Sequence, residues 1–273
     1  MDRRQLVVDT KGGADFTSIA DAVRAAAPGD AVVLRMGLYE EKVHLSKDIE
    51  VCLDAGVEPG EAIINSGVIV TATVVLRNVY IEQVVDVRKG SATLFSCNLS
   101  QGSDGVRVCT GAKASLNECV IHDITVGGDG VYVQEGGAVE LIKCDIGNCR
   151  VNGVHAKGGE VTVKECRIHD CDFGLYFRKG ARGAVEGNIL ERIKSFGIYV
   201  TGGSDPVILK NQVKLCDIHG VMISQQGAGT LRDNEVDASV RILRGCAPTL
   251  NVNQITGRID NELAVPTPLG ATA

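Results

Sequence analysis

The chain has 273 residues, a net charge of −6, and 44% hydrophobic and 23% charged residues. These values are typical of a folded globular protein and exclude a disordered one, and the negative charge argues against a general nucleic-acid binder. The composition also includes 33 Gly, no Trp and only 4% aromatic residues. It predicts a core of small aliphatic side chains in short strands joined by many turns.

The first predicted element is an amphipathic helix over residues 15–26. Its apolar positions include Phe16, Ile19, Ala20 and Val23, and the Pro-Gly-Asp at 28–30 ends it. We expect this helix to cover the first coil of the repeat described next.

A repeated unit occupies the rest of the chain. Each unit contains a Gly followed by alternating apolar residues, and successive units are 25, 23, 21, 23 and 23 residues apart. The glycines are Gly105, Gly130, Gly153, Gly174, Gly197 and Gly220. A second series of small residues runs in phase with the first: Asn78, Cys97, Cys119, Cys144, Cys166, Asn188, Asn211, Asn234 and Asn253.

This repeat predicts the fold. A unit of about 22 residues with strand-type alternation cannot bury its apolar face alone, so it stacks on its neighbours. A leucine-rich repeat is excluded because the units lack its leucine pattern and helical return. The sequence therefore predicts an all-β, single-stranded right-handed parallel β-helix in which equivalent residues form ladders along the axis. The first interior ladder is Val106, Val131, Val154, Leu175, Ile198 and Val221; the second is Val108, Val133, Ala156, Phe177, Val200 and Ile223. Stacked Asn side chains are expected to hydrogen-bond one another at a corner, where Cys fills the same small slot.

The domain organisation follows from the repeat. We expect one β-helix domain over residues 1–264, comprising an N-terminal strand and capping helix (1–30), early coils (31–100) and regular coils (101–264). Residues 265–273, which contain two prolines, are expected to be a flexible tail. No run of about 18 apolar residues could span a membrane, and the N-terminus lacks the apolar stretch of a signal peptide. We therefore expect a reducing, cytoplasmic location despite ten cysteines.

Two parts of the chain resemble known β-helix proteins. Residues 13–23 (GADFTSIADAV), 28–30 and 37–43 (GLYEEKV) resemble the opening of pectin methylesterases and of the wider pectin-lyase-like superfamily. Residues 205–213 (DPVILKNQV) and 247–255 (APTLNVNQI) resemble the repeats of F-box, Shc-binding-protein and NosD-type β-helix domains. The matching residues are those that make coils and turns, so the resemblance implies the fold and says little about function.

No catalytic residue is predicted. The resemblance to pectin methylesterases implies motifs of the types Gln-Asp-Thr, Asp-Phe-Ile-Phe-Gly and Gly-Arg-Pro-Trp, and none occurs in the sequence. Polysaccharide lyases of this fold need clustered acids for Ca²⁺ and a basic residue. Asp123 and Asp170 are expected two coils apart, about 9–10 Å, which is too far to share one ion without other ligands.

Two further patterns are interpreted as structural. The His122-Asp123 and His169-Asp170 pairs occupy a position that varies between coils, which indicates a solvated face. The regularly spaced cysteines at 144, 149, 166 and 171 suit zinc in type, but their ladder positions indicate buried filler. No metal and no cofactor is therefore expected.

The strongest functional signal is one outward-facing row. The middle residue of each Gly-apolar-x-apolar strand must face outward because its neighbours face inward. This row is Arg107, Tyr132, His155, Tyr176, Tyr199 and Met222, and the residues two positions further on are Gln134, Lys157, Arg178, Thr201 and Ser224. The predicted partner-binding residues are Arg107, Tyr132, Gln134, His155, Lys157, Tyr176, Arg178 and Tyr199, since exposed Tyr beside Arg and Lys is typical of recognition surfaces. The alternative is that stacked rings only stabilise the sheet.

Three functions remain open. The sequence favours a non-catalytic scaffold that binds an extended protein or peptide along this row. A carbohydrate-binding module is the second possibility, although the lack of Trp counts against it, and a carbohydrate-active enzyme such as a lyase or esterase is the third. End-to-end self-association through exposed strand edges is also possible.

Overall fold

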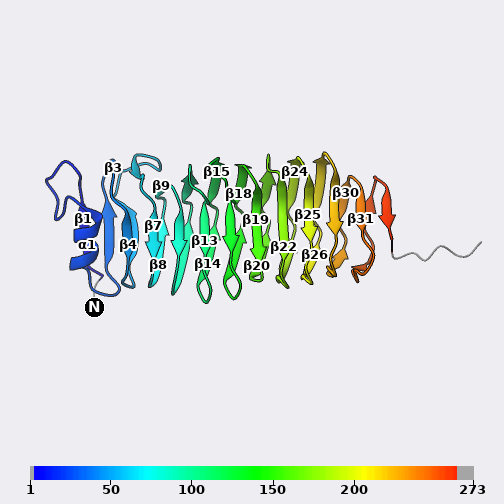
Figure 1. Cartoon of the computed structure of the whole chain (residues 1–273). Coiled ribbons are helices and arrows are strands. Elements are labelled where there is room, and N and C mark those ends of the chain that lie inside the picture. Colours follow the sequence, from blue (N-terminus) through cyan, green and yellow to red (C-terminus); the bar gives the residue numbers. More distant parts are fainter. Residues whose placement is uncertain (1–2, 263–273) are drawn as a thin grey trace, which may run out of the picture.

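The fold is an elongated stack of coils built from three parallel sheets (Figure 1). We analysed a computed structural model, which describes residues 3–262. Every strand pairing it contains joins equivalent strands of successive coils in parallel register, as in the pairing of Tyr132 with His155. The predicted parallel β-helix is therefore confirmed.

The sheets are named A, B and C in the order in which a coil visits them. Sheet A contains β1 (Gln5–Val8), β2 (Ala31–Leu34), β5 (Glu50–Leu53), β8 (Thr73–Arg77), β11 (Ser91–Phe95), β14 (Lys113–Asn117), β17 (Ala138–Ile142), β20 (Glu160–Lys164), β23 (Arg182–Glu186), β26 (Asp205–Leu209), β29 (Thr230–Arg232) and β32 (Thr249–Leu250). Sheet B contains β3 (Gly37–Tyr39), β6 (Ala62–Ile64), β9 (Tyr80–Glu82), β12 (Asn98–Ser100), β15 (Val120–Ile124), β18 (Asp145–Cys149), β21 (Arg167–His169), β24 (Ile189–Ile193), β27 (Gln212–Cys216), β30 (Glu235–Asp237) and β33 (Gln254–Ile255). Sheet C contains β4 (Val43–Leu45), β7 (Val68–Val70), β10 (Val85–Val87), β13 (Val106–Val108), β16 (Val131–Val133), β19 (Asn152–Lys157), β22 (Phe173–Arg178), β25 (Phe196–Val200), β28 (His219–Ile223), β31 (Val240–Ile242) and β34 (Ile259–Asn261).

The interior of the stack is one continuous apolar core. Both predicted ladders of sheet C are at most 1% exposed, and they pair in the predicted register. Alternation explains this burial, since successive side chains of a strand point to opposite faces of its sheet. In β14, for example, Ala114 and Leu116 are buried and Ser115 between them is not.

The repeated glycines of sheet C are required by space rather than by a left-handed backbone. A Cβ atom on Gly174 would lie 2.5 Å from the carbonyl oxygen of Gly197 and 2.8 Å from Cδ2 of Leu190. The same crowding occurs at Gly130 and Gly153. We expect Gly174→Ala to lower the free energy of unfolding by about 1–3 kcal/mol, the usual cost of overpacking a core. Urea denaturation measures this loss, and an unchanged midpoint would contradict the close packing of sheets B and C.

The corner between sheets A and B carries the predicted ladder of Asn and Cys, with one correction. Asn188, Asn211 and Asn234 hydrogen-bond in succession through their side chains at 2.9 Å. The prediction was wrong at Asn78, which is exposed, while Val79 is the fully buried residue of that coil. Asn78 instead has a left-handed backbone (φ 57°), a conformation that Asn tolerates better than most residues.

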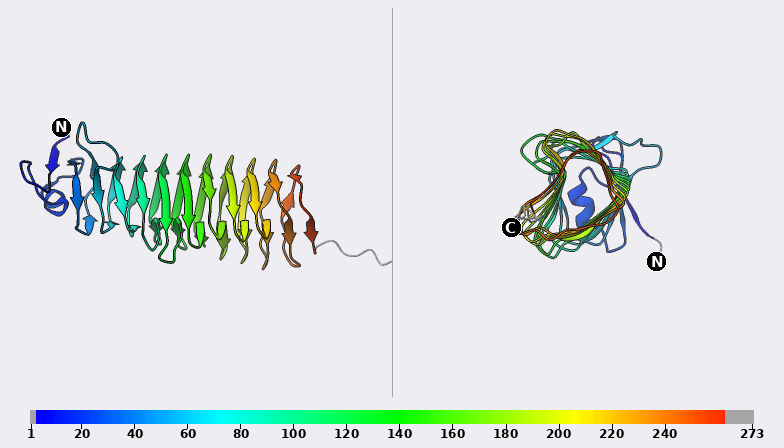
Figure 2. Two further views of the ribbon diagram at one scale, coloured as in Figure 1. Left: turned by 90° about the horizontal axis from the view of Figure 1, so that it is seen from above. Right: turned by 90° about the vertical axis from the view of Figure 1, so that its right-hand side faces the viewer.

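The N-terminal helix covers the end of the stack, as predicted, but it is shorter than expected. Helix α1 (Ile19–Ala25) lies across the coil outline in the view along the axis (Figure 2). Its N-cap is Ser18, whose side chain accepts a hydrogen bond from the backbone N–H of Asp21. The segment before Ser18 stays extended because Phe16 forms a bridge with Val8 of β1.

The remaining predictions concern the ends of the chain and membranes. The expected flexible tail at 265–273 lies outside the described residues. Within residues 3–262, no helix is long and apolar enough to cross a membrane.

Candidate functional site

The predicted outward row lies on the middle coils of sheet C. His155 pairs in register with Tyr132 on one side and with Tyr176 on the other, and Tyr176 pairs with Tyr199. The three tyrosines are half-buried, whereas His155 is only 7% exposed. The row therefore faces outward as expected, but His155 is packed between its neighbours.

The rings of this row stack along the solenoid axis. Ring centroids are 5.0 Å apart between Tyr132 and His155, between His155 and Tyr176, and between Tyr176 and Tyr199. The last two pairs are stacked, with interplanar angles of 14° and 4°. Because the ring faces contact each other, the ring edges face outward. Sugars usually stack on an exposed flat ring face, whereas this row exposes ring edges.

A second file of rings, which the sequence did not single out, lies beside the first. Phe173 contacts both Tyr176 and Tyr199, and Phe196 contacts Tyr199 and His219. In each coil, the residue of this second file stands three positions before the residue of the outward row, and the crowded glycine lies between the two. The aromatic surface is therefore two rings wide over β22 and β25.

His155 forms the centre of a buried hydrogen-bond chain. Its Nδ1 lies 2.7 Å from Oδ2 of Asp129, and the Nε of Arg178 donates to its Nε2 at 2.8 Å. Asp129 is only 8% exposed. A guanidinium can only donate, so Nε2 is the acceptor and Nδ1 carries the proton that is donated to Asp129. The imidazole is therefore neutral, with its basic nitrogen directed toward Arg178.

Two further polar side chains hold Asp129 in place. The Nδ2 of Asn152 donates to Oδ1 of Asp129, and the backbone N–H of Asp129 donates to Oδ1 of Asp104 at 3.1 Å. Asp104 also accepts from Arg107 at 2.9 Å. Oδ1 of Asn152 is buried without a hydrogen-bond partner among residues 3–262.

The sequence reasoning missed Asp104, Asp129 and Asn152. The available signal was an Asp-Gly or Asn-Gly dipeptide directly before the alternating residues of three successive coils.

The predicted cations behave in two different ways. Arg107 forms a close ion pair with Asp104, so its charge is neutralised. Lys157 and Arg178 are register partners on adjacent strands, which lie about 4.8 Å apart. In the described part of the chain, neither has a carboxylate within ion-pair distance. Two adjacent cations without an acidic partner repel each other, and a bound anion would relieve that repulsion.

The tyrosine hydroxyls also differ along the row. Tyr199 hydrogen-bonds Ser224 at 3.0 Å, whereas the hydroxyls of Tyr132 and Tyr176 have no protein partner among residues 3–262. Burial raises the pKa of Tyr176 above its usual value, so its hydroxyl is a hydrogen-bond donor at neutral pH. The Cζ atom of Arg178 lies 5.7 Å from the centre of the Tyr176 ring. Tyr132 and Tyr176 therefore leave free hydroxyls on both sides of His155.

The His-Asp pairs of sheet B lie away from this site. His169 is held between Asp170 at 2.6 Å and Asp145 at 2.9 Å, and His122 contacts Asp123 and Asn98. Among the described residues, no group of three acidic, His or Cys side chains is arranged to hold a metal ion. Asn148 donates a hydrogen bond to Asp123, and Arg192 donates one to Asp170. Cys144, Cys149, Cys166 and Cys171 are buried free thiols.

Glu191 is the centre of the ion-pair network on sheet B and predicts a dependence of stability on pH. Arg167, Lys214 and Arg192 lower the pKa of Glu191 from its ordinary value of 4.5 to about 2, and Arg167 has the largest effect. A carboxyl whose pKa is depressed on folding stabilises the protein above its unfolded pKa, and this stability is lost as the pH falls. We expect the wild type to lose about 1 kcal/mol of unfolding free energy between roughly pH 4.5 and 2, after allowing for solvent screening. Across this pH range, the free energy of unfolding should fall less steeply for Glu191→Gln than for the wild type. Equal slopes would contradict this role of Glu191.

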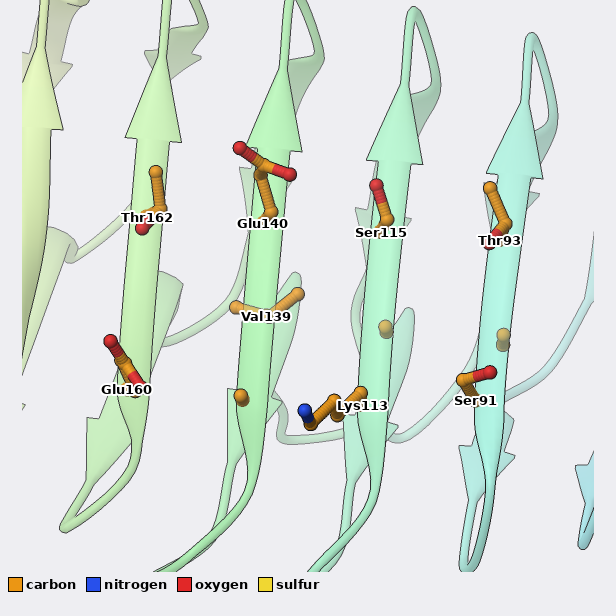
Figure 3. Close-up of a pocket in the computed structure, with 11 residues that line it drawn as sticks. Ser91, Thr93, Lys113, Ser115, Val139, Glu140, Glu160 and Thr162 are labelled. Atoms are coloured by element: carbon orange, nitrogen blue, oxygen red, sulfur yellow. The ribbon is translucent and has the colours of Figure 1, made fainter. Parts of the chain in front are cut away.

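A shallow depression of about 390 Å³ lies on the outer face of sheet A, where small side chains leave space (Figure 3). Thr93, Ser115, Glu140 and Thr162 form one row across it. The carboxylate of Glu140 is paired with Lys164 at 3.5 Å. Unlike the sheet C site, this surface has no pair of adjacent free cations and no histidine among its lining residues.

Comparisons with known proteins agree on the fold. The family model described as "Right handed beta helix region" matches residues 104–255, more than half of the chain. No curated protein sequence matches the chain significantly.

Several solved structures are similar to this one at low sequence identity. An alginate lyase from Paenibacillus sp. str. FPU-7 has a TM-score of 0.71 and 13% identity, over 92% of this chain and 99% of that one. Pectate lyase Pel9A has a TM-score of 0.62 and 12% identity, over 100% and 82%. The A-module of mannuronan C-5 epimerase AlgE4 from Azotobacter vinelandii has a TM-score of 0.61 and 14% identity, over 88% and 91%. At these identities the similarity shows the fold alone, and it agrees with the resemblance to the pectin-lyase-like superfamily. The chain belongs to the right-handed β-helix family.

Proposed function

We propose that the outer face of sheet C binds an acidic polysaccharide and that His155 removes the proton from the carbon next to a sugar carboxylate. The observation that carries this proposal is a neutral imidazole, held by Asp129, directly beside the free cations Lys157 and Arg178. A base next to a carboxylate-binding pair is what proton abstraction α to a carboxylate requires.

The chemistry can be written with the residues present. The C–H bond next to the carboxylate breaks, its proton bonds to Nε2 of His155, and its electron pair is delocalised onto the carboxylate. Lys157 and Arg178 stabilise the additional negative charge on that carboxylate. Asp129 stabilises the imidazolium that forms and keeps the ring oriented.

Arg178 has two roles in this proposal. In the free protein its Nε–H covers Nε2 of His155. A substrate carboxylate would form a bidentate, charge-assisted pair with the guanidinium, which is stronger than its single hydrogen bond to the imidazole. Binding would therefore draw Arg178 away from Nε2 and expose the base only when substrate is present.

The fold comparisons are consistent with this chemistry. The names of three similar structures refer to alginate, pectate and mannuronan, which are polymers of sugar acids. Because the similarity itself is limited to the fold, the proposal depends on the site of this chain. Recognition of a protein or peptide partner and a cytoplasmic location stay predictions that no comparison tests.

Binding of acidic polysaccharides tests the first half of the proposal. We expect Lys157→Ala/Arg178→Ala to lower the affinity for at least one of polygalacturonate and hyaluronan by about 10- to 100-fold or more, since each charge-assisted contact contributes about 1.5–3 kcal/mol. The control Lys164→Ala/Lys210→Ala removes the same charge from β20 of sheet A and from the corner that follows β26, and it should leave the affinity unchanged. Equal losses in the two variants, or no binding of either polymer by the wild type, would contradict the proposal.

A further inference from the structure

The groups of the proposed site all lie on one face of one sheet. His155 and Tyr176 are register partners in the outward row of β19 and β22, and Lys157 and Arg178 stand two positions after them in the same strands. Side chains two residues apart in a strand point to the same side of its sheet. A sugar bound to the two cations therefore meets His155 and Tyr176 from the same side.

Tyr176 places a free hydroxyl beside the proposed base. Its ring is stacked on the imidazole of His155, with centroids 5.0 Å apart and an interplanar angle of 14°. The hydroxyl has no protein partner among residues 3–262. Burial raises the pKa of Tyr176 above its usual value, so the hydroxyl carries its proton at neutral pH and can donate it.

Arg178 distinguishes Tyr176 from Tyr132, the other tyrosine beside His155. Its Cζ atom lies 5.7 Å from the centre of the Tyr176 ring, so the guanidinium charge stabilises the phenolate that forms when the hydroxyl gives up its proton. The register partner of Tyr132 is instead Arg107, whose charge is neutralised by Asp104. Tyr176 is therefore the better proton donor of the two.

We infer that Tyr176 donates a proton to the glycosidic oxygen on C4 of the bound sugar acid, so that the chain is cleaved by elimination. Because His155 and Tyr176 approach from one side, cleavage is limited to sugar acids in which O4 and the hydrogen on C5 lie on the same side of the ring. This inference rests on the proposed function and adds to it a second catalytic residue and the substrate class.

The elimination balances without a co-reactant. After His155 has taken the proton from C5, the electron pair held on the carboxylate forms a C4=C5 double bond, the C4–O4 bond breaks, and O4 takes the proton of the Tyr176 hydroxyl. The imidazolium then returns a proton to the tyrosinate through solvent, so both side chains regain their starting states. One product ends in an unsaturated sugar and the other in a new hydroxyl.

The approach from one face selects among the sugar acids. In D-mannuronate and D-glucuronate, the C5 hydrogen and O4 are on the same side of the ring, so both can face sheet C at once. In D-galacturonate and L-guluronate they are on opposite sides. When the C5 hydrogen of these sugars faces His155, O4 lies on the far side of the ring from Tyr176. Such polymers can bind Lys157 and Arg178 and lose the C5 proton, but their chains stay intact.

Polymannuronate and polyguluronate test this restriction, because they differ only in the configuration at C5. Hyaluronan, which contains D-glucuronate, and polygalacturonate form a second pair. All four are tritiated at C5; ultraviolet absorbance measures unsaturated ends, and tritium in the solvent measures proton removal. We expect the wild type to cleave at least one of polymannuronate and hyaluronan, at a rate at least about 100-fold above its rate on polyguluronate and polygalacturonate.

Two variants test the role of the tyrosine hydroxyl. Tyr176→Phe keeps the stacked ring, so it should lower the rate of cleavage about 10²- to 10⁴-fold, the usual contribution of a general acid, while tritium release falls by less than about 10-fold. The matched control is Tyr80→Phe on β9 of sheet B, which removes a hydroxyl that hydrogen-bonds Ser100 at 2.9 Å. It should cleave at the wild-type rate.

The outcomes separate this inference from the proposed function. If tritium is released but no polymer is cleaved, or polyguluronate or polygalacturonate is cleaved as fast as the other two, the inference is wrong and His155 remains the base. The inference is equally wrong if Tyr176→Phe cleaves at the wild-type rate, or loses cleavage and tritium release to the same extent. If none of the four polymers releases tritium, the proposed function itself is wrong.

Discussion

Replacing Asn211 by Ala is expected to lower the free energy of unfolding by about 3–5 kcal/mol, the largest effect of any single substitution considered for this fold. The Oδ1 atom of Asn211 accepts hydrogen bonds from the backbone N–H and from the side chain of Asn188, at 3.0 and 2.9 Å. Its Nδ2 donates to the backbone oxygen of Val185 at 2.9 Å. All of these groups are in a corner where Asn211 is 0% exposed. The alanine variant leaves several buried polar groups unpaired, and each costs about 1–3 kcal/mol.

Two control variants separate the ladder from simple packing. Asn211→Cys should lower the free energy of unfolding less than Asn211→Ala does. Cys166 occupies the same ladder position, and its sulfur accepts a hydrogen bond from the backbone N–H of Cys144 at 3.3 Å. Asn117→Ala removes a half-buried side chain whose one hydrogen bond within residues 3–262 goes to Ser115, and it should change stability by less than about 0.5 kcal/mol. Urea denaturation gives all three values. An Asn211→Ala loss as small as that of Asn117→Ala would show that the Asn ladder does not hold the coils together.

The second large effect is expected at His155. If Nε2 of His155 is the base, His155→Gln should lower the rate of proton transfer by about 10²- to 10⁴-fold, the usual contribution of a general base. Binding should change by only a few fold, because Lys157 and Arg178 remain. Asp129→Asn should also lower the rate, since it removes the negative charge that orients the imidazole and stabilises its protonated form.

The chain contains a matched control for this experiment. His169 forms a similar contact with Asp170 at 2.6 Å, but it lies on sheet B. His169→Gln should therefore leave the rate unchanged. Equal rates for wild type and His155→Gln would show that the contact between Asp129 and His155 is structural.

The fold was predictable from the sequence because it depends on local rules that repeat. Alternation placed Val154 and Ala156 inside and His155 outside, and the period set which residues stack. The error at Asn78 has a local cause: an Asn occurs one residue early, at the left-handed corner, while Val79 fills the interior position.

The site was predictable only in part. Periodicity identified the row that contains His155 and Arg178, but it could not show that Asp129 reaches His155 from the preceding coil. That contact depends on the direction of a side chain at the corner between sheets B and C, three residues before the outward row. The sequence also could not show which cations form ion pairs. Arg107 and Arg178 are both predicted to face outward on sheet C, but of the two only Arg107 has an acidic partner among residues 3–262.

Release of tritium from a polysaccharide labelled at the carbon next to the carboxylate tests directly whether His155 removes that proton. This measurement detects removal of the proton whether the reaction then proceeds by elimination or by inversion. The proposal predicts release into solvent by the wild type, none above background by His155→Gln, and wild-type release by His169→Gln. If the wild type binds the labelled polymer at Lys157 and Arg178 without releasing tritium, the claim that His155 is a base is wrong.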